Sequence, residues 1–224
     1  MSTTRASAFA LVELLVVMAL IAAVAIAMVG AAKGGGRTVA LETAQGTIAN
    51  AVALARTRAI ASGVTVRLLV HNSPESPLAR ERYRRLIVLA EESGGSWRAK
   101  DGFKLPDGIY LLPYRTRVPA GMYAVASEWR TANNQQTLGS SALENSPMAF
   151  RYDTEVVEDW EWVSFTARGT VDGVGALIVA AGRERGAVVD TGNSPIELIE
   201  PGNVRGVVLS NYGVPRLVND RGGF

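Results

Sequence analysis

The sequence contains no cysteine and a single histidine, His71. The absence of cysteine excludes disulfide bonds, thiolate nucleophiles and cysteine-based zinc sites. A histidine-rich metal site or a Ser-His-Asp triad would depend on His71 alone. His71 ends an alternating, strand-like pattern and has no acidic pair beside it in the sequence. We therefore expect His71 to face solvent.

Motifs for binding nucleotide phosphates are also missing. No G-x-x-x-x-G-K-[ST] loop is present, and residues 169–175 (GTVDGVG) match a dinucleotide fingerprint too loosely. The 23 Lys and Arg residues barely exceed the 21 Asp and Glu residues, whereas a protein whose main partner is nucleic acid usually has a larger basic excess. These absences argue against an enzyme, and we predict no cofactor and no metal.

A long apolar run occupies residues 9–32 and ends before Lys33. As a helix it would reach roughly 36 Å at 1.5 Å per residue, enough to cross a hydrocarbon core of ~30 Å. We therefore predict a transmembrane helix over residues 9–32. Arg5 precedes this run without any acid. Because basic flanks stay in the cytoplasm, the C-terminal body is expected on the other side of the membrane.

Glu13 is the one charged residue within this run. A charge costs about 2.5–3.5 kcal/mol at the centre of a membrane helix and less near an interface. The run could be a signal peptide cut near Ala27 or Ala32, or a plain anchor with Glu13 hydrated at the membrane edge. The third interpretation, in which Glu13 meets a partner within the bilayer, accounts for both the length and the charge.

The segment from Ala8 to Leu15 (AFALVELL) resembles the processing site of type IV prepilins and type II secretion pseudopilins. In that family a short basic leader is cut before a phenylalanine, and a glutamate is the fifth residue of the mature chain. The resemblance implies a leader over residues 1–8, cleavage by a prepilin peptidase between Ala8 and Phe9, and N-methylation of Phe9. The sequence departs from the family pattern at Ala8, where glycine is usual.

The resemblance also implies a role for Glu13 in filament assembly and recruitment. Cleavage would leave a positively charged amine on Phe9, which could pair with Glu13 of a neighbouring subunit or of the same one. Opposite charges a few ångströms apart in a low-dielectric setting attract strongly, and each offsets the desolvation of the other.

Residues 33–63 are predicted to form a linker and an amphipathic continuation of the N-terminal helix. Gly34, Gly35 and Gly36 each disfavour a helix by about 1 kcal/mol relative to alanine, so we expect a break there. An apolar face then recurs at three- and four-residue steps, up to a C-cap at Gly63. This face comprises Leu41, Ala44, Ile48, Val52, Ala55 and Ala59.

The remaining sequence, residues 64–224, is predicted to form one β-rich domain. Alternating apolar residues predict strands near residues 64–71 and 83–90, and residues 111–147 are expected to form a long irregular excursion that contacts a partner. Further short strands are predicted over residues 161–165, 175–180, 187–190, 196–199 and 204–210, with a turn at 211–215. The fold class is therefore α+β, with a long N-terminal helix followed by an antiparallel sheet or sandwich.

Two charged clusters lie in this domain. The basic cluster of Arg80, Arg82, Arg84 and Arg85 is predicted to form a polar face. The acidic stretch of Asp153, Glu155, Glu158, Asp159 and Glu161 lacks the spacing of an EF-hand and is also expected to be solvated.

Three segments of the body, residues 55–66, 105–109 and 162–169, are similar to the H-type minor pseudopilins and their pilus counterparts. The resemblance implies a structural subunit of a type II secretion pseudopilus, anchored in the inner membrane with a periplasmic body. Its expected partners are other pseudopilins, an inner-membrane assembly platform and membrane lipid. The alternative is a minor pilin for DNA uptake or adhesion, suggested by Arg205, Arg216 and Arg221 together with the basic cluster of residues 80–85.

Overall fold

A computed structural model describes residues 7–74, 81–131, 136–153, 157–185 and 193–224, except for the side chains of residues 7–12 and 23–35. The chain divides into two compact units, Met1–Val39 and Ala40–Phe224. The strand predicted at 187–190 and most of the predicted leader lie outside the described residues. Over the described residues, no helix has a stretch both long enough and apolar enough to span a membrane.

One long helix, α1 (Ser7–Ser62), contains the expected helical segments of both units. Gly34, Gly35 and Gly36 lie within α1. The helix continues through them, so the predicted break is wrong. Glycine weakens a helix without forbidding it, and good helix formers flank this triplet. Gly63 ends α1 as predicted, with a φ of 67° and its N–H donating to the Ala59 carbonyl at 3.1 Å.

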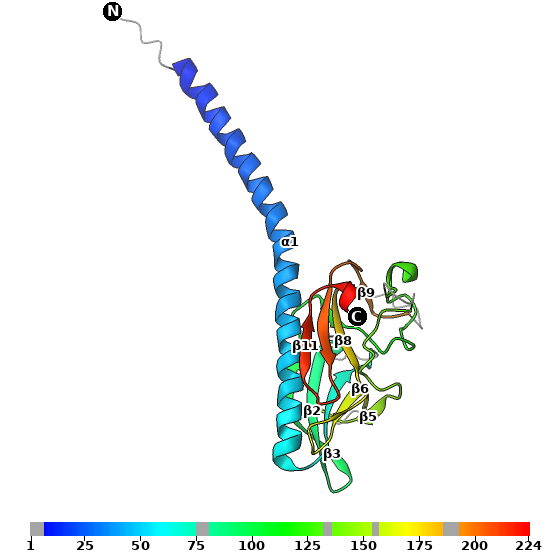
Figure 1. Ribbon diagram of the computed structural model, residues 1–224. Coiled ribbons are helices and arrows are strands. Elements are labelled where there is room, and N and C mark those ends of the chain that lie inside the picture. The colour runs from blue at the N-terminus through cyan, green and yellow to red at the C-terminus, as the bar shows by residue number, and fades with distance from the viewer. Residues whose placement is uncertain (1–6, 75–80, 132–135, 154–156, 186–192) are drawn as a thin grey trace, which may run out of the picture. The chain divides into compact units, whose positions relative to one another are not determined.

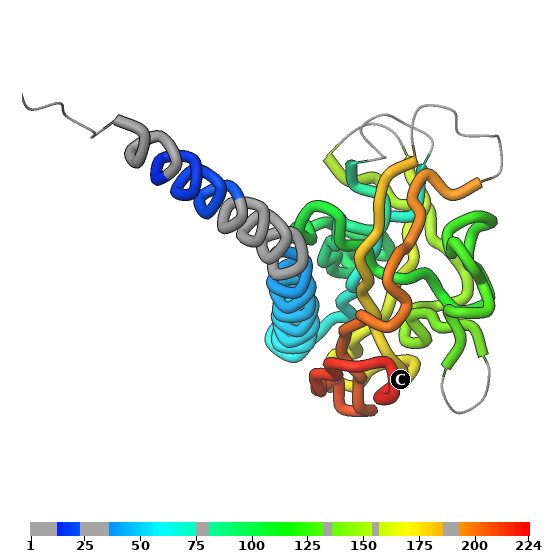
Figure 2. The backbone as a smooth tube through the Cα atoms, turned by 90° about the horizontal axis from the view of Figure 1, so that it is seen from above, coloured from blue at the N-terminus to red at the C-terminus, as the bar shows by residue number. Residues whose placement is uncertain are grey.

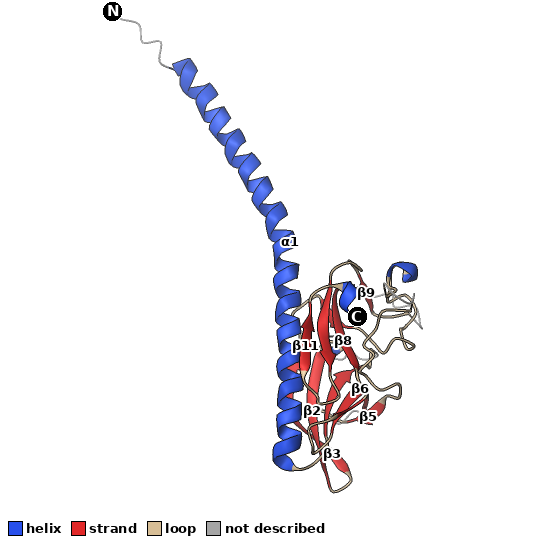
Figure 3. Ribbon diagram, viewed as in Figure 1, coloured by secondary structure: helices blue, strands red, loops and turns tan. Residues whose placement is uncertain are grey.

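Two antiparallel sheets follow the helix (Figures 1 and 3). The first sheet has the order β3-β2-β1-β6-β5, with β7 also paired to β6. Its strands are β1 (Val66–His71), β2 (Leu86–Ser93), β3 (Ser96–Lys104), β5 (Met148–Phe150), β6 (Glu158–Phe165) and β7 (Val171–Asp172). The second sheet has the order β11-β10-β8-β4, with β9 also paired to β8. Its strands are β4 (Ile109–Leu111), β8 (Gly175–Glu184), β9 (Ile196–Leu198), β10 (Val204–Leu209) and β11 (Pro215–Val218).

These strands confirm the predicted α+β class. The expected strands around residues 64–71, 161–165, 175–180, 196–199 and 204–210 are all present, some with shifted ends. Strands β3, β4, β5 and β7 were not predicted. Strand β3 reads SWRAKDGFK and is largely exposed, so it lacks the alternation of apolar residues by which a strand is recognised.

The main core lies between the C-terminal part of α1 and the inner faces of both sheets. It contains the whole predicted apolar face of the helix, with Leu41, Ile48 and Val52 fully buried. Leu68 and Val163 reach this core from the first sheet, and Leu177 and Val207 reach it from the second sheet. The periodicity of the helix therefore identified its packing face correctly.

The outer face of the second sheet is covered by the irregular segment that follows β4. Figure 2 shows this segment, in green, on the side of β8 away from α1. Its only regular element in the described part is the short 3-10 helix η1 (Ala126–Glu128), but it buries its own core side chains. Tyr123 and Trp129 stack with ring centroids 4.8 Å apart. The expectation of irregular structure is confirmed, and a large part of the segment is nevertheless buried.

Candidate functional site

Within the N-terminal unit, the described side chains of residues 13–22 form an exposed helical surface that is apolar apart from Glu13. Every side chain from Glu13 to Ala22 is exposed within the chain, including Leu14 at 67% and Met18 at 63%. A continuous exposed apolar surface marks a place that a protein or a lipid covers. This segment is therefore the candidate assembly site.

Glu13 is the one charged side chain among residues 13–22. One and two helical turns further on, its face carries valine, leucine and isoleucine side chains. No cation among the described side chains forms an ion pair with Glu13. The side chains of Ala8 and Phe9 lie outside the described ones, so cleavage and methylation there stay predictions.

In the body, His71 does not face solvent as expected. Its side chain is fully buried, and its Nε2 lies 3.3 Å from Oε2 of Glu158, which is also buried. The edge of Trp160 packs against the imidazole with ring centroids 4.9 Å apart. Burial lowers the pKa of His71 below its ordinary value of 6.5, although the Glu158 carboxylate opposes this shift. The prediction was wrong because aromatic side chains cover this outer face of the first sheet.

The basic cluster is also not the predicted polar face. Arg84 is fully buried and its Nη1 and Nη2 both donate to Oε2 of Glu161 at 2.8 Å. Arg85 is buried and pairs with Asp107, and Arg82 forms two hydrogen bonds with Asp153. Arg80 lies outside the described residues. These arginines therefore join segments of the body together.

The predicted strand over 83–90 begins only at Leu86, and the backbone gives the reason. Arg84 has a φ of 58°, a left-handed conformation that interrupts a strand. Its N–H donates to the His71 carbonyl at 3.0 Å and its own carbonyl accepts from Leu111 at 2.8 Å. The same turn buries the Arg84 side chain, so strand alternation failed to predict where it points.

The acidic stretch is also partly internal. Glu161 is fully buried and Glu158 nearly so, which corrects the prediction that the stretch is solvated. Asp159 is exposed, while Glu155 lies outside the described residues. Among the described residues, no group of three or more His, Cys, Asp or Glu side chains is placed to hold a metal ion.

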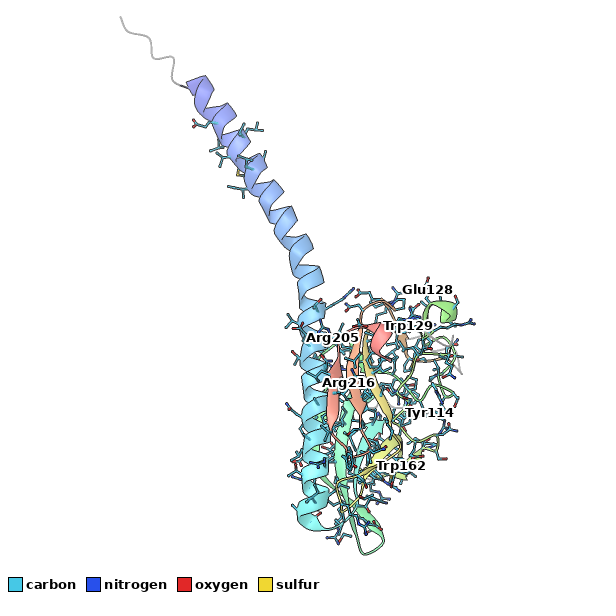
Figure 4. All side chains as sticks on the ribbon, in the orientation of Figure 1. Tyr114, Glu128, Trp129, Trp162, Arg205 and Arg216 are labelled. Atoms are coloured by element: carbon cyan, nitrogen blue, oxygen red, sulfur yellow. The ribbon has the colours of Figure 1, made fainter. Side chains whose placement is uncertain are left out.

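The three C-terminal arginines do not share one surface. Arg205 points toward α1 and pairs with Glu42 at 3.1 Å. Arg216 is opposite Val208 in the β10–β11 register. Val208 is three residues from Arg205, so the two arginines lie on opposite faces of their sheet. Arg221 donates to the Arg130 carbonyl. Figure 4 labels Arg205 and Arg216 on their neighbouring strands. Nucleic-acid contact by these residues stays a prediction.

A small pocket lies on the outer face of the second sheet. Arg115, Thr131, Ser141 and Phe224 are among its lining residues, and its volume is about 130 Å³. Pockets for small-molecule ligands usually measure roughly 300–1,000 Å³. The pocket is therefore too small to suggest a substrate site.

Two solved structures resemble this chain, and both are of the minor pseudopilin EpsH from the type II secretion system of Vibrio cholerae. They are 10% and 12% identical to it, and in each case the match covers 80% of this chain and 96% of the other, with a TM-score of 0.39. No family model matches the chain, and no curated protein matches its sequence.

Proposed function

We propose that this chain is a minor pseudopilin, a structural subunit of a type II secretion pseudopilus that supports protein export. The observation that carries the proposal is the position of Glu13 as the one charge in a long apolar helical run, four residues after Phe9 and a short basic leader, with the side chains from Glu13 to Ala22 exposed. An enzyme would not need this arrangement, whereas a filament subunit that is held first in a membrane and later among its neighbours would use all of it.

In the proposed pathway, the chain inserts in the inner membrane with the leader in the cytoplasm and the body in the periplasm. A prepilin peptidase cuts between Ala8 and Phe9, and the new amine of Phe9 is methylated. Methylation keeps the positive charge of the amine. The charge can therefore pair with Glu13 as the subunit leaves the assembly platform for the filament.

The pairing fits the energetics of the apolar surface. An isolated carboxylate in a low-dielectric setting loses its hydration, and a cation within a few ångströms offsets much of that loss. A subunit out of register would leave Glu13 without this partner. The carboxylate would thus select the register of helix packing, while the apolar side chains around it supply the contact area.

The mature N-terminus tests the proposal directly. The full chain is produced in a cell that contains a prepilin peptidase, purified from the membrane fraction and analysed by intact mass and N-terminal peptide mass spectrometry. We expect a chain that starts at Phe9 and carries one added methyl group. An unprocessed Met1, or a cut near Ala27 or Ala32, would contradict the proposal.

A matched pair of variants separates processing from expression. Ala8→Gly restores the residue usual in the family and should be processed at least as fully as the natural chain. Phe9→Asp keeps the leader but places an acid at the new N-terminus, so it should accumulate uncut. The minor-pilin alternative needs a joint basic surface, and the separate positions of Arg205, Arg216 and Arg221 do not favour it.

A further inference from the structure

A short segment packs over the outer face of the first sheet, where His71 is buried. In the strand register His71 lies directly opposite Trp160 of β6, and Phe150 of β5 lies directly opposite Glu158. Glu158 and Trp160 are two residues apart on one strand, so all four side chains share one face of the sheet. We call residues 150–153, which begin in β5, the cover segment.

The cover segment spans this face from one edge of the sheet to the other. Strand β5 is an edge strand of the first sheet (Figure 1). The Tyr152 hydroxyl lies over Gly102 of β3, the opposite edge strand, where a Cβ atom would come within 2.6 Å of it. The Tyr152 ring also packs on Trp160, with ring centroids 6.1 Å apart. The cover segment therefore shields the middle of the face, where β1 places His71.

Few contacts hold the cover segment in place. Strand β5 is only three residues long, and Trp160 Nε1 donates to the Phe150 carbonyl at 3.2 Å. At the other end, Asp153 accepts two hydrogen bonds from Arg82 at 2.7 and 2.9 Å, and ion pairs near the surface contribute little stability. Strand β1, in contrast, lies between β2 and β6, and its inner face belongs to the main core. Local opening of the cover segment therefore costs less than the unfolding of β1.

The imidazole on this face lacks hydrogen bonds. Neither Nδ1 nor Nε2 of His71 forms one with a described residue, and Oε2 of Glu158, 3.3 Å from Nε2, forms none either. Buried polar atoms in proteins are nearly always paired. A protonated imidazole has two donors to satisfy, and Glu158 lies beside only one of them. The closed face is therefore suited to a neutral His71.

The charges around His71 act in both directions. Glu158 attracts an imidazolium, whereas Arg82 and Arg84 repel it, and burial lowers the pKa of His71 below 6.5 despite Glu158. The carboxylates paired with these two arginines are Asp153 and Glu161. A protonated His71 is therefore more stable where water can reach it.

We propose that His71 and the cover segment form an acid-sensitive latch. In mildly acidic solution His71 takes up a proton, and the cover segment moves off the face while the rest of the body stays folded. Opening brings water to the imidazole and exposes the rings of Phe150 and Trp160. These residues all belong to the unit Ala40–Phe224, so the latch is independent of how the N-terminus is processed.

Hydrogen exchange of the full-length protein in a zwitterionic detergent tests the latch. Mass spectrometry at pH 7.5 and pH 5.5 gives the protection factor of a peptide that contains residues 148–153, corrected for the effect of pH on chemical exchange. Because opening exposes a histidine with a pKa near 6.5, this factor should be about 5- to 10-fold lower at pH 5.5. It should stay below that of β1 at both pH values and should not respond to dilute urea, as expected for local opening.

Two variants identify the group that takes up the proton. His71→Gln should reduce the change between the two pH values to less than about twofold. Asp153→Asn frees one end of the cover segment, so it should lower protection at both pH values and keep the ratio between them. Circular dichroism should confirm that both variants are folded.

Three results would overturn the proposal. The first is an undiminished pH effect in His71→Gln, and the second is its loss in Asp153→Asn, which would make that carboxylate the sensor. The third is equal protection of the cover segment and β1 at each pH in the natural chain, because opening would then be global unfolding.

Discussion

The guanidinium of Arg84 and the carboxylate of Glu161 form an ion pair inside the body that ties its two sheets together. Glu161 belongs to β6 of the first sheet, and Arg84 Nε donates to the carbonyl of Leu111, in β4 of the second sheet, at 3.1 Å. The backbone N–H of Tyr114 also donates to Glu161 Oε2, at 3.3 Å. Both side chains are fully buried, so neither has water to replace a lost partner.

Removal of one partner should therefore destabilise the body strongly. We expect Glu161→Leu to lower the free energy of unfolding by about 3–5 kcal/mol, because the Arg84 cation is left buried and unpaired. For a chain of this size that corresponds to a fall in Tm of roughly 6–20 °C. Thermal unfolding of the full chain, followed by the fluorescence of buried Trp129 and Trp160, measures the effect.

Two further variants make this prediction specific. Asp153→Asn breaks the surface pair with Arg82 and should change stability by less than about 1 kcal/mol. The double variant Arg84→Met/Glu161→Leu removes both buried charges, so it should be more stable than Glu161→Leu alone. If the double variant loses as much free energy of unfolding as Arg84→Met and Glu161→Leu lose when their separate losses are added, the two residues act separately.

Local patterns predicted the helix and most strands, and the residues concerned show why. The buried face of α1 from Leu41 to Ala59 repeats at helical spacing, and strands such as β10 are bounded by turn residues. These signals lie within a few residues of one another. The pairing of Arg84 with Glu161 joins residues 77 positions apart, and no local pattern contains that information.

The failed prediction for His71 has the same origin. Strand alternation correctly placed its side chain on the outer face of the first sheet, but the sequence gives no local sign that this face is covered. Leu69, Val88, Phe150 and Trp160 form a separate buried cluster there. Whether a strand face is exposed to solvent or buried depends on which segments, distant in the sequence, pack over it.

The burial of His71 predicts a pH dependence of stability. Because burial lowers the pKa of the folded His71 below 6.5, the unfolded chain binds its proton first as the pH falls. Stability should therefore be complete above about pH 6.5 and should decrease as the pH drops below that value. Arg82 and Arg84 reinforce this direction and Glu158 opposes it. The Tm measured between pH 7.5 and pH 5 should show the decrease.

His71→Gln is the control for this pH dependence, since it keeps a donor beside Glu158 without a titrating ring. His71 is the only histidine in the chain, so the variant should have a flatter Tm profile between pH 6.5 and pH 5. An unchanged slope would assign the dependence to other groups.

Gln45 connects α1 to β10 and β11 through hydrogen bonds, and we expect these bonds to stabilise β11. It is buried, and its Nε2 donates both to the Gly206 carbonyl at 2.8 Å and to the Val218 carbonyl at 2.9 Å. Gln45→Leu would leave two carbonyls unsatisfied, at a cost of about 2–4 kcal/mol. Hydrogen exchange should show faster exchange in β11 and the adjoining part of β10. Asn50→Leu, at an exposed position of the same helix, should leave these rates unchanged.

Glu13→Ala should separate anchoring from assembly. The change removes the only charge from an apolar surface, so under the proposed function the protein should remain in the membrane fraction and be processed at Phe9 as before. The variant should fail to enter filaments, because the methylated amine of Phe9 on a neighbouring subunit would have no carboxylate with which to pair. Crosslinking between engineered cysteines on adjacent subunits, together with export of a secreted substrate, measures the loss. Glu42→Ala, which removes an acid further along the same helix, is the matched control and should assemble normally. Normal assembly of Glu13→Ala would instead mean that Glu13 is simply hydrated at the membrane edge.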